Sequence, residues 1–104
     1  MKRNQTERFR RVAEFEVNEH CRQATQIDAM IADLGRICID LGHQIEAEET
    51  RARIHDPAHF AYPTYAKAAR ERHANIQRSM NALKAEFDRL RSETAEAGDQ
   101  QHAA

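Results

Sequence analysis

The chain has 104 residues and a formal net charge of -1, because sixteen basic side chains nearly balance seventeen acidic ones. A chain of this length forms one domain at most and has no room for the large core of a typical enzyme. The balanced charge also argues against a dedicated nucleic-acid binder, which usually carries a clear basic excess.

The sequence shows no segment that would place the protein in a membrane or export it. It contains no run of about 18 apolar residues, the length that a membrane-spanning helix needs. The first residues, MKRNQTERFRRVAEF, are basic but lack the apolar stretch of a secretory signal. We therefore expect a cytoplasmic protein, in which Cys21 and Cys38 stay reduced. A disulfide between chains or a metal site is the alternative for these two cysteines.

A long helix is predicted over the first half of the chain, from about residue 5 to about residue 53. Asn4 and Glu7 resemble a capping box, and no proline follows until Pro57. The run EAEETRAR, residues 46 to 53, predicts a solvated face with Glu48 near Arg51. Mainly apolar residues recur in alternating steps of three and four, which is the heptad stripe of a coiled coil. The stripe consists of Ala13, Val17, His20, Ala24, Ile27, Ile31, Leu34, Cys38, Leu41, Ile45, Glu48 and Ala52.

A second helix with the same spacing is predicted from about residue 64 to about residue 97. Gly98 predicts its end, and residues 98–104 are expected to be disordered because they offer almost nothing apolar to bury. The second stripe consists of Tyr62, Ala66, Ala69, His73, Ile76, Met80, Leu83, Phe87, Leu90, Thr94 and Ala97.

The connection, residues 54 to 63, holds both prolines of the chain. Asp56 before Pro57 predicts a capped helical turn, and Pro63 disfavours helical geometry at Tyr62, so we expect the chain to bend twice. A short connection favours antiparallel neighbours. The predicted fold is therefore all-α, an antiparallel coiled-coil hairpin whose end is closed by the aromatic residues of the turn.

The two stripes also predict a register. If Ala52 meets Tyr62, paired residue numbers add up to about 114, which matches Ile45 with Ala69, Leu34 with Met80 and Ile27 with Phe87. In this register a second helix that ends near residue 97 leaves roughly the first ten to fifteen residues of the first helix without a partner.

The uncovered residues form a candidate partner-binding surface. Residues 1 to 11 carry a net charge of +4, and large apolar residues lie among the arginines. Apolar side chains bordered by arginine are typical of protein interfaces, although a frayed and solvated end is the alternative. The candidate residues are Arg8, Phe9, Arg10, Arg11, Val12 and Phe15.

No pattern in the sequence indicates catalysis. It contains no glycine-rich phosphate loop, no HExxH, no CxxC and no GxSxG motif. The six histidines are scattered, and the one pair at i, i+4 spacing, His55 and His59, straddles Pro57. We therefore expect no enzyme activity, no metal and no cofactor.

One part of the sequence resembles a known family. "MIADL" and then "AEETRARIHDPAHFAYPTYAKAARERHANI" resemble the alphaproteobacterial branch of the flagellar export protein J family, FliJ. The resemblance covers roughly residues 9 to 92, and its most specific part is the HFAYPT motif, residues 59 to 64. In this family a long helix, a turn of this type and a returning helix recur.

The resemblance implies a non-enzymatic component of the flagellar type III protein export apparatus, cytoplasmic and peripherally associated with the inner membrane. Such proteins bind the hexameric export ATPase and the cytoplasmic domain of the export gate, and they escort export chaperones. The candidate surface of the first helix would then contact the ATPase, while Phe60, Tyr62 and Tyr65 are candidates for gate or chaperone contact. A homodimer is possible on the sequence alone. The alternatives are a generic coiled-coil scaffold and a nucleic-acid-binding helical hairpin.

Overall fold

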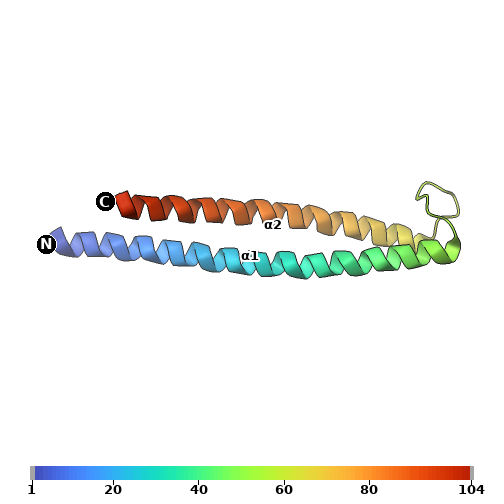
Figure 1. Cartoon of the computed structure of the whole chain (residues 1–104), viewed down its shortest axis with the longest axis horizontal. Coiled ribbons are helices and arrows are strands. Elements are labelled where there is room, and N and C mark those ends of the chain that lie inside the picture. Colours follow the sequence, from blue (N-terminus) through green and yellow to red (C-terminus); the bar gives the residue numbers. More distant parts are fainter. Residues whose placement is uncertain (1, 104) are drawn as a thin grey trace. The chain divides into compact units, whose positions relative to one another are not determined.

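The computed structural model describes the backbone of residues 2–103 and the side chains of residues 4–96. Two helices account for most of this backbone: α1 spans Lys2–Ala52, with 51 residues, and α2 spans Thr64–Ala103, with 40 residues. Residues 53–63 form the corner between them, as Figure 1 shows, and the described backbone contains no strand. The predicted all-α fold with two long helices is confirmed.

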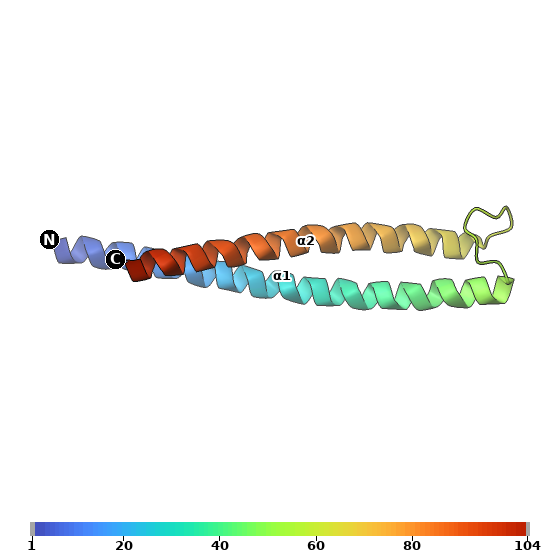
Figure 2. The same ribbon diagram turned by 45° about the horizontal axis from the view of Figure 1, so that its top comes forward.

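The helices divide into two compact units. Unit 1 consists of Met1–Ala29 and Leu83–Ala104, and unit 2 consists of Met30–Ala82, which includes the corner. Within each unit a segment of α1 lies antiparallel beside a segment of α2, and the two views in Figures 1 and 2 agree on this.

In unit 2 the core is small and follows the predicted stripes. Leu41, Ile45 and Ala69 are buried together, and the half-buried Ile76 packs against them, so the predicted match of Ile45 with Ala69 is confirmed. Further along, Met80 Sδ lies 3.9 Å from Cys38 Sγ, one helical turn past the predicted partner Leu34. Burial of these side chains is the main favourable term that holds the two segments together.

Among the side chains that the structure describes in unit 1, fewer are buried. Ala24 and Leu90 are buried, and Phe87 is half-buried. The seam also contains His20, whose Nε2 lies 3.7 Å from Glu93 Oε2 on α2. His20 Nδ1 is the one buried side-chain nitrogen or oxygen among the described residues that lacks a hydrogen-bond partner. A polar group at a seam position weakens the packing while it helps to fix the register.

The heptad stripes correctly predict which residues are covered. Every predicted stripe position whose side chain is described is buried or half-buried except Ala52, which is exposed. Ala52 is exposed because α1 ends there and the chain turns into the corner. Ala97 lies outside the described side chains.

The helix ends at the corner agree with the predicted ones, about 53 and about 64, whereas the two outer ends differ from the prediction. α1 begins at Lys2, so Asn4 lies inside the helix and the predicted capping box is wrong. α2 continues through Gly98 to Ala103, so the predicted stop at Gly98 is also wrong. One glycine costs a helix only about 1 kcal/mol relative to alanine, and no proline follows it. Ala104 lies outside the described residues.

The greater length of α2 changes the expected overhang in unit 1. In both ribbon views the start of α1 lies beyond the end of α2 (Figures 1 and 2). The uncovered part of α1 is shorter than predicted, because the prediction placed the end of α2 near residue 97 and the helix continues to Ala103.

Candidate interaction surfaces

The N-terminal patch, defined as Arg8, Phe9, Arg10, Arg11, Val12 and Phe15, lies on α1 in unit 1. All of these side chains are exposed, and Phe9 keeps 76% of its surface accessible. Exposed large apolar side chains that lie close together are unusual on a folded surface and commonly mark a binding site.

Helical spacing brings only part of the N-terminal patch together. Gln5, Arg8, Phe9 and Val12 lie at steps of three and four residues and line one open hollow. Phe15 follows one turn later beside Arg8 and Val12. Arg10 falls on another side of the helix, where its Nε lies 3.9 Å from Glu14 Oε1. The structure therefore assembles Arg8, Phe9, Val12 and Phe15, with Arg11 at the edge next to Phe15, and separates Arg10 from them.

The corner begins at the end of α1, where the sequence has no glycine to mark the end of a helix. The Ile54 N–H donates to the Glu49 carbonyl at 3.2 Å, and the Arg53 N–H donates to the Thr50 carbonyl at 3.3 Å. This is the bond pattern of a Schellman motif, whose key residue adopts the left-handed conformation that favours glycine. Here that residue is Arg53, with φ of 58°.

Two successive turns then reverse the chain. The His59 N–H donates to the Asp56 carbonyl at 3.0 Å, and the Tyr62 N–H donates to the His59 carbonyl at 3.0 Å. The Ala58 N–H donates to Asp56 Oδ1 at 2.9 Å, so the predicted cap at Asp56 is confirmed, although the segment that it caps is a turn and not a helical turn. The prediction that the chain bends twice is confirmed.

Each part of the HFAYPT motif has a distinct place in the corner. The His59 ring stacks on Phe60 with 4.7 Å between centroids, and its Nδ1 accepts a hydrogen bond from the Ala61 N–H at 3.0 Å. The Pro63 carbonyl accepts from the Lys67 N–H at 3.0 Å, which makes it the first acceptor of α2. The motif thus forms a backbone-bonded turn that leads directly into the helix.

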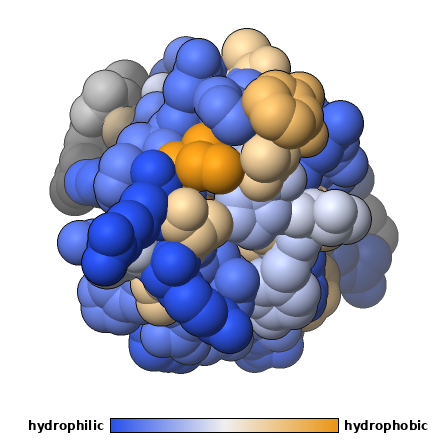
Figure 3. Space-filling view, turned by 90° about the vertical axis from the view of Figure 1, so that its right-hand side faces the viewer, coloured by the Kyte–Doolittle hydropathy of each residue, from blue (hydrophilic) through white to orange (hydrophobic). Residues whose placement is uncertain are grey.

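The three aromatic candidates of this region differ in exposure. Phe60 is 97% exposed and Tyr65 is also exposed, whereas Tyr62 is buried. Figure 3 looks onto the corner end of the molecule, where apolar side chains appear among hydrophilic ones. The expectation that all three close the hairpin is wrong, because only Tyr62 is covered. Tyr62 is therefore a packing residue, and the exposed partner-binding candidates are Phe60 and Tyr65.

Tyr62 belongs to a polar network that joins α1 to α2. Arg70 Nη2 donates to Glu49 Oε1 at 2.9 Å and Arg70 Nε donates to Tyr62 Oη at 2.8 Å. His55 Nδ1 lies 3.7 Å from Glu49 Oε2. The hydrogen bonds from Arg70 to Tyr62 and then to Glu49 raise the pKa of Arg70 above its ordinary value. The Arg70 guanidinium thereby balances the negative charge of the Glu49 side chain, which is only 5% exposed.

Residues 46 to 53 were predicted to form a solvated face, and this network was not predicted. The predicted pair of Glu48 with Arg51 does form. The neighbouring Glu49 is buried instead of solvated, and its partner Arg70 lies 21 positions further along the chain. No local pattern connects these two residues, so the ion pair becomes visible only in the folded chain.

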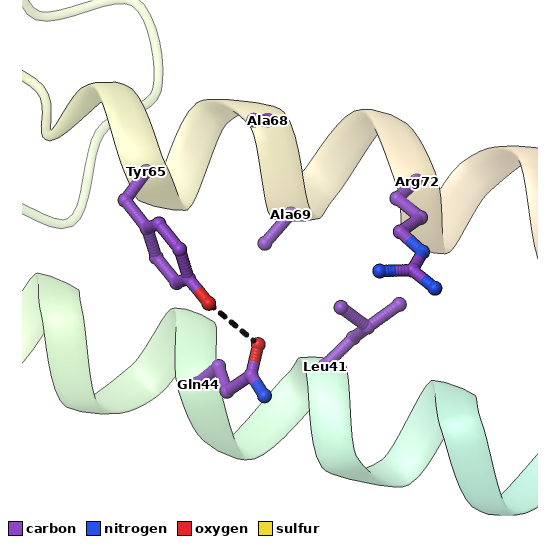
Figure 4. Close-up of a pocket in the computed structure, with 6 residues that line it drawn as sticks. All are labelled: Leu41, Gln44, Tyr65, Ala68, Ala69 and Arg72. Carbon is purple, nitrogen blue, oxygen red and sulfur yellow. Dashed lines mark hydrogen bonds between the residues drawn. The ribbon is translucent and has the colours of Figure 1, made fainter.

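A second hollow lies between the helices of unit 2 (Figure 4). Tyr65 and Arg72 reach from α2 toward α1, and the Tyr65 hydroxyl donates to Gln44 Oε1 at 3.3 Å. Leu41 and Ala69 form the floor between them. The hollow is lined by Leu41, Gln44, Tyr65, Ala68, Ala69 and Arg72.

Comparisons with known proteins add no identification: no family model, no curated protein and no solved structure matches the chain. Neither helix, over the part of the chain that the structure describes, is long and apolar enough to cross a membrane. Among the described side chains, no three His, Cys, Asp or Glu residues gather where they would hold a metal ion. Both cysteines are free thiols, with Cys21 exposed and Cys38 buried.

Proposed function

We propose that this chain is a non-enzymatic interaction protein of the flagellar type III export apparatus, which binds the export ATPase, the export gate and export chaperones. The observation that carries the proposal is the N-terminal patch, where Phe9, Val12 and Phe15 stay exposed on a helix that also presents arginines. Three large apolar side chains favour a protein partner over a phosphate backbone, which is bound mainly by charge. The export apparatus itself is inferred from the resemblance of the HFAYPT region to the FliJ family.

The corner supports a second contact. Two turns, a side-chain cap and the buried Tyr62 fix the backbone around Phe60, which remains almost completely exposed. A fixed aromatic side chain loses little conformational entropy when a partner binds it, so such residues serve as binding anchors. We assign Phe60, with the exposed Tyr65, to contact with the gate or the chaperones.

Binding measurements with two variants test this assignment. Replacing Phe9, Val12 and Phe15 with alanine should weaken binding to the export ATPase at least tenfold, since burial of one such side chain contributes about 1.5–3 kcal/mol. Phe60→Ala should weaken gate or chaperone binding and leave ATPase binding unchanged. Each variant is the control for the other, because both remove exposed aromatic side chains and spare the seam.

Calorimetric titration against each purified partner gives the affinities, and swimming assays report on function. Unchanged ATPase affinity and unchanged motility of the triple variant would show that the N-terminal patch is not the ATPase contact. Absence of binding between the unmodified chain and the ATPase, gate and chaperones together would refute the export assignment and leave a coiled-coil scaffold of another system.

A further inference from the structure

The paired helices of unit 2 have two flanks, one on either side of the seam. Residues that directly precede a stripe position of α1 lie on one flank, and residues that directly follow one lie on the other, because successive residues rotate by about 100° around the helix. We name the first the Met30 flank: Met30, Ile37 and Gln44 of α1 with Tyr65 and Arg72 of α2. The second is the Glu49 flank: Gly35, Gly42 and Glu49 of α1 with Arg70 and Gln77 of α2.

The Glu49 flank is closed by contacts within the chain. Arg70 pairs with Glu49, and Gln77 Oε1 lies 3.7 Å from Cys38 Sγ. The polar groups of this flank satisfy one another, and its exposed apolar residue, Ile39, lies at the outer edge of α1, away from the Met30 flank.

The Met30 flank is open and apolar on the α1 side. Met30 is 50% exposed, and Ile37, one heptad later, is 37% exposed. With the stripe, α1 therefore presents three apolar positions per heptad in this region instead of two. A two-helix coiled coil covers only the narrow stripe, while the wider face is typical of helices in larger bundles.

Two copies of the chain that face each other through the Met30 flank would bring opposite charges together at its edges. Asp40 lies at the α1 edge and Arg72 at the α2 edge, and the structure gives neither an ion-pair partner among the described residues. Asp33, the other acidic residue of the α1 edge, already pairs with Arg36. Both free charges lie at one level, since Arg72 and Leu41 line the same hollow. Within one chain the acidic edge and the basic edge belong to different helices.

We infer that the Met30 flank binds a second copy of this chain, with α1 of each copy beside α2 of the other. A two-fold axis parallel to the helices keeps every residue at its own level, so Asp40 of each copy meets Arg72 of the other. Met30, Ile37 and the hollow between Leu41 and Ala69 become the buried centre of a four-helix unit. This inference uses only unit 2 and does not depend on the proposed export function.

Sedimentation velocity on the full chain tests the dimer. The unmodified protein should pass from monomer to dimer as its concentration rises, and Ile37→Glu should weaken this association at least tenfold. Ile39→Glu is the matched control: Ile39 is 60% exposed on the same helix but lies away from the Met30 flank, so association should be unchanged. An unmodified chain that stays monomeric up to millimolar concentration would overturn the inference, as would equal effects of the two substitutions.

Charge reversal separates a true interface from damage to the fold. Asp40→Arg and Arg72→Asp should each reduce self-association, because each puts like charges opposite one another. An equal mixture of the two variants should recover the association, since one copy then carries two basic groups and the other two acidic ones. Recovery requires that both variants are folded and that the contact lies between chains. Failure of the mixture to associate, with circular dichroism showing intact helices, would refute the proposed pairing.

Discussion

At Arg53 the backbone adopts a conformation that usually belongs to glycine. A side chain with a Cβ atom in the left-handed region costs roughly 1–2 kcal/mol, because Cβ approaches the following carbonyl oxygen. Two backbone hydrogen bonds, from Arg53 and Ile54 to the last turn of α1, hold the residue there. The end of α1 therefore depends on backbone bonding and not on a glycine signal in the sequence.

This strain predicts a stabilising substitution. Arg53→Gly should raise the free energy of unfolding by about 1 kcal/mol, because glycine adopts a positive φ without a steric cost. Ala52→Gly, one residue earlier and inside α1, is the control and should lower stability by roughly 0.5–1 kcal/mol. Thermal and urea unfolding measure both. A destabilised Arg53→Gly variant would show that the arginine side chain contributes more than its backbone costs.

At the scale of the helix, α1 carries two glycines that the structure does not require. A Cβ atom at Gly42 would meet nothing within 4 Å, and one at Gly35 would meet Met80 Cε at an ordinary 3.7 Å. Neither residue adopts a positive φ. Glycine inside a helix is less favourable than alanine by about 1 kcal/mol, so both positions weaken α1.

We therefore expect Gly42→Ala and Gly35→Ala each to raise the free energy of unfolding by about 1 kcal/mol, and to do so nearly additively. Urea denaturation with far-ultraviolet circular dichroism gives these values. The added methyl groups would displace a partner that packs closely against Gly35 and Gly42. Loss of partner binding by a stabilised variant would therefore show that the glycines have a role in recognition.

The helices and their ends at the corner were largely predictable from the sequence, and their outer ends were not. The spacing of residues such as Leu41, Ile45 and Ala69 predicts a covered stripe because helical geometry alone decides which positions share a face. The end of α1 depends on an arginine in a glycine-like conformation, and α2 runs through the glycine that predicted its end. Helix ends are set by small energy differences that local composition does not reveal.

For the interaction surfaces, the sequence predicted part of what the structure shows. Exposure of Phe9, Val12 and Phe15 agrees with their position outside the stripe. Tyr62 was assigned to a partner because aromatic residues cluster in the corner, yet the network with Arg70 and Glu49 buries it. That network joins residues far apart in sequence, and periodicity within a single helix carries no information about such pairs.

Across unit 2 as a whole, the network of Glu49, Tyr62 and Arg70 connects α1, the corner and α2. Removing Arg70 leaves the Glu49 carboxylate buried without its main partner, so Arg70→Met should lower the free energy of unfolding by about 1–3 kcal/mol. Adding Glu49→Gln should recover part of the loss, because the buried group then carries no charge. Lys67→Met, one turn away and exposed, is the control and should change stability by less than about 0.5 kcal/mol. Chemical denaturation of the unmodified chain, Arg70→Met, Glu49→Gln and the double variant completes a double-mutant cycle, and additive effects would show that Arg70 and Glu49 do not interact.

The double turn at the corner also has a consequence for how the protein folds. Contact between Gln44 and Tyr65 closes a loop of only 21 residues, whereas contact between Cys38 and Met80 closes a loop of 42. Closing a short loop costs less chain entropy than closing a long one. Contacts between the helices should therefore form first beside the prolines and then spread outward along the helices. The speed of folding would then depend mainly on Asp56, His59 and their neighbours, a few residues that bury almost none of the apolar surface.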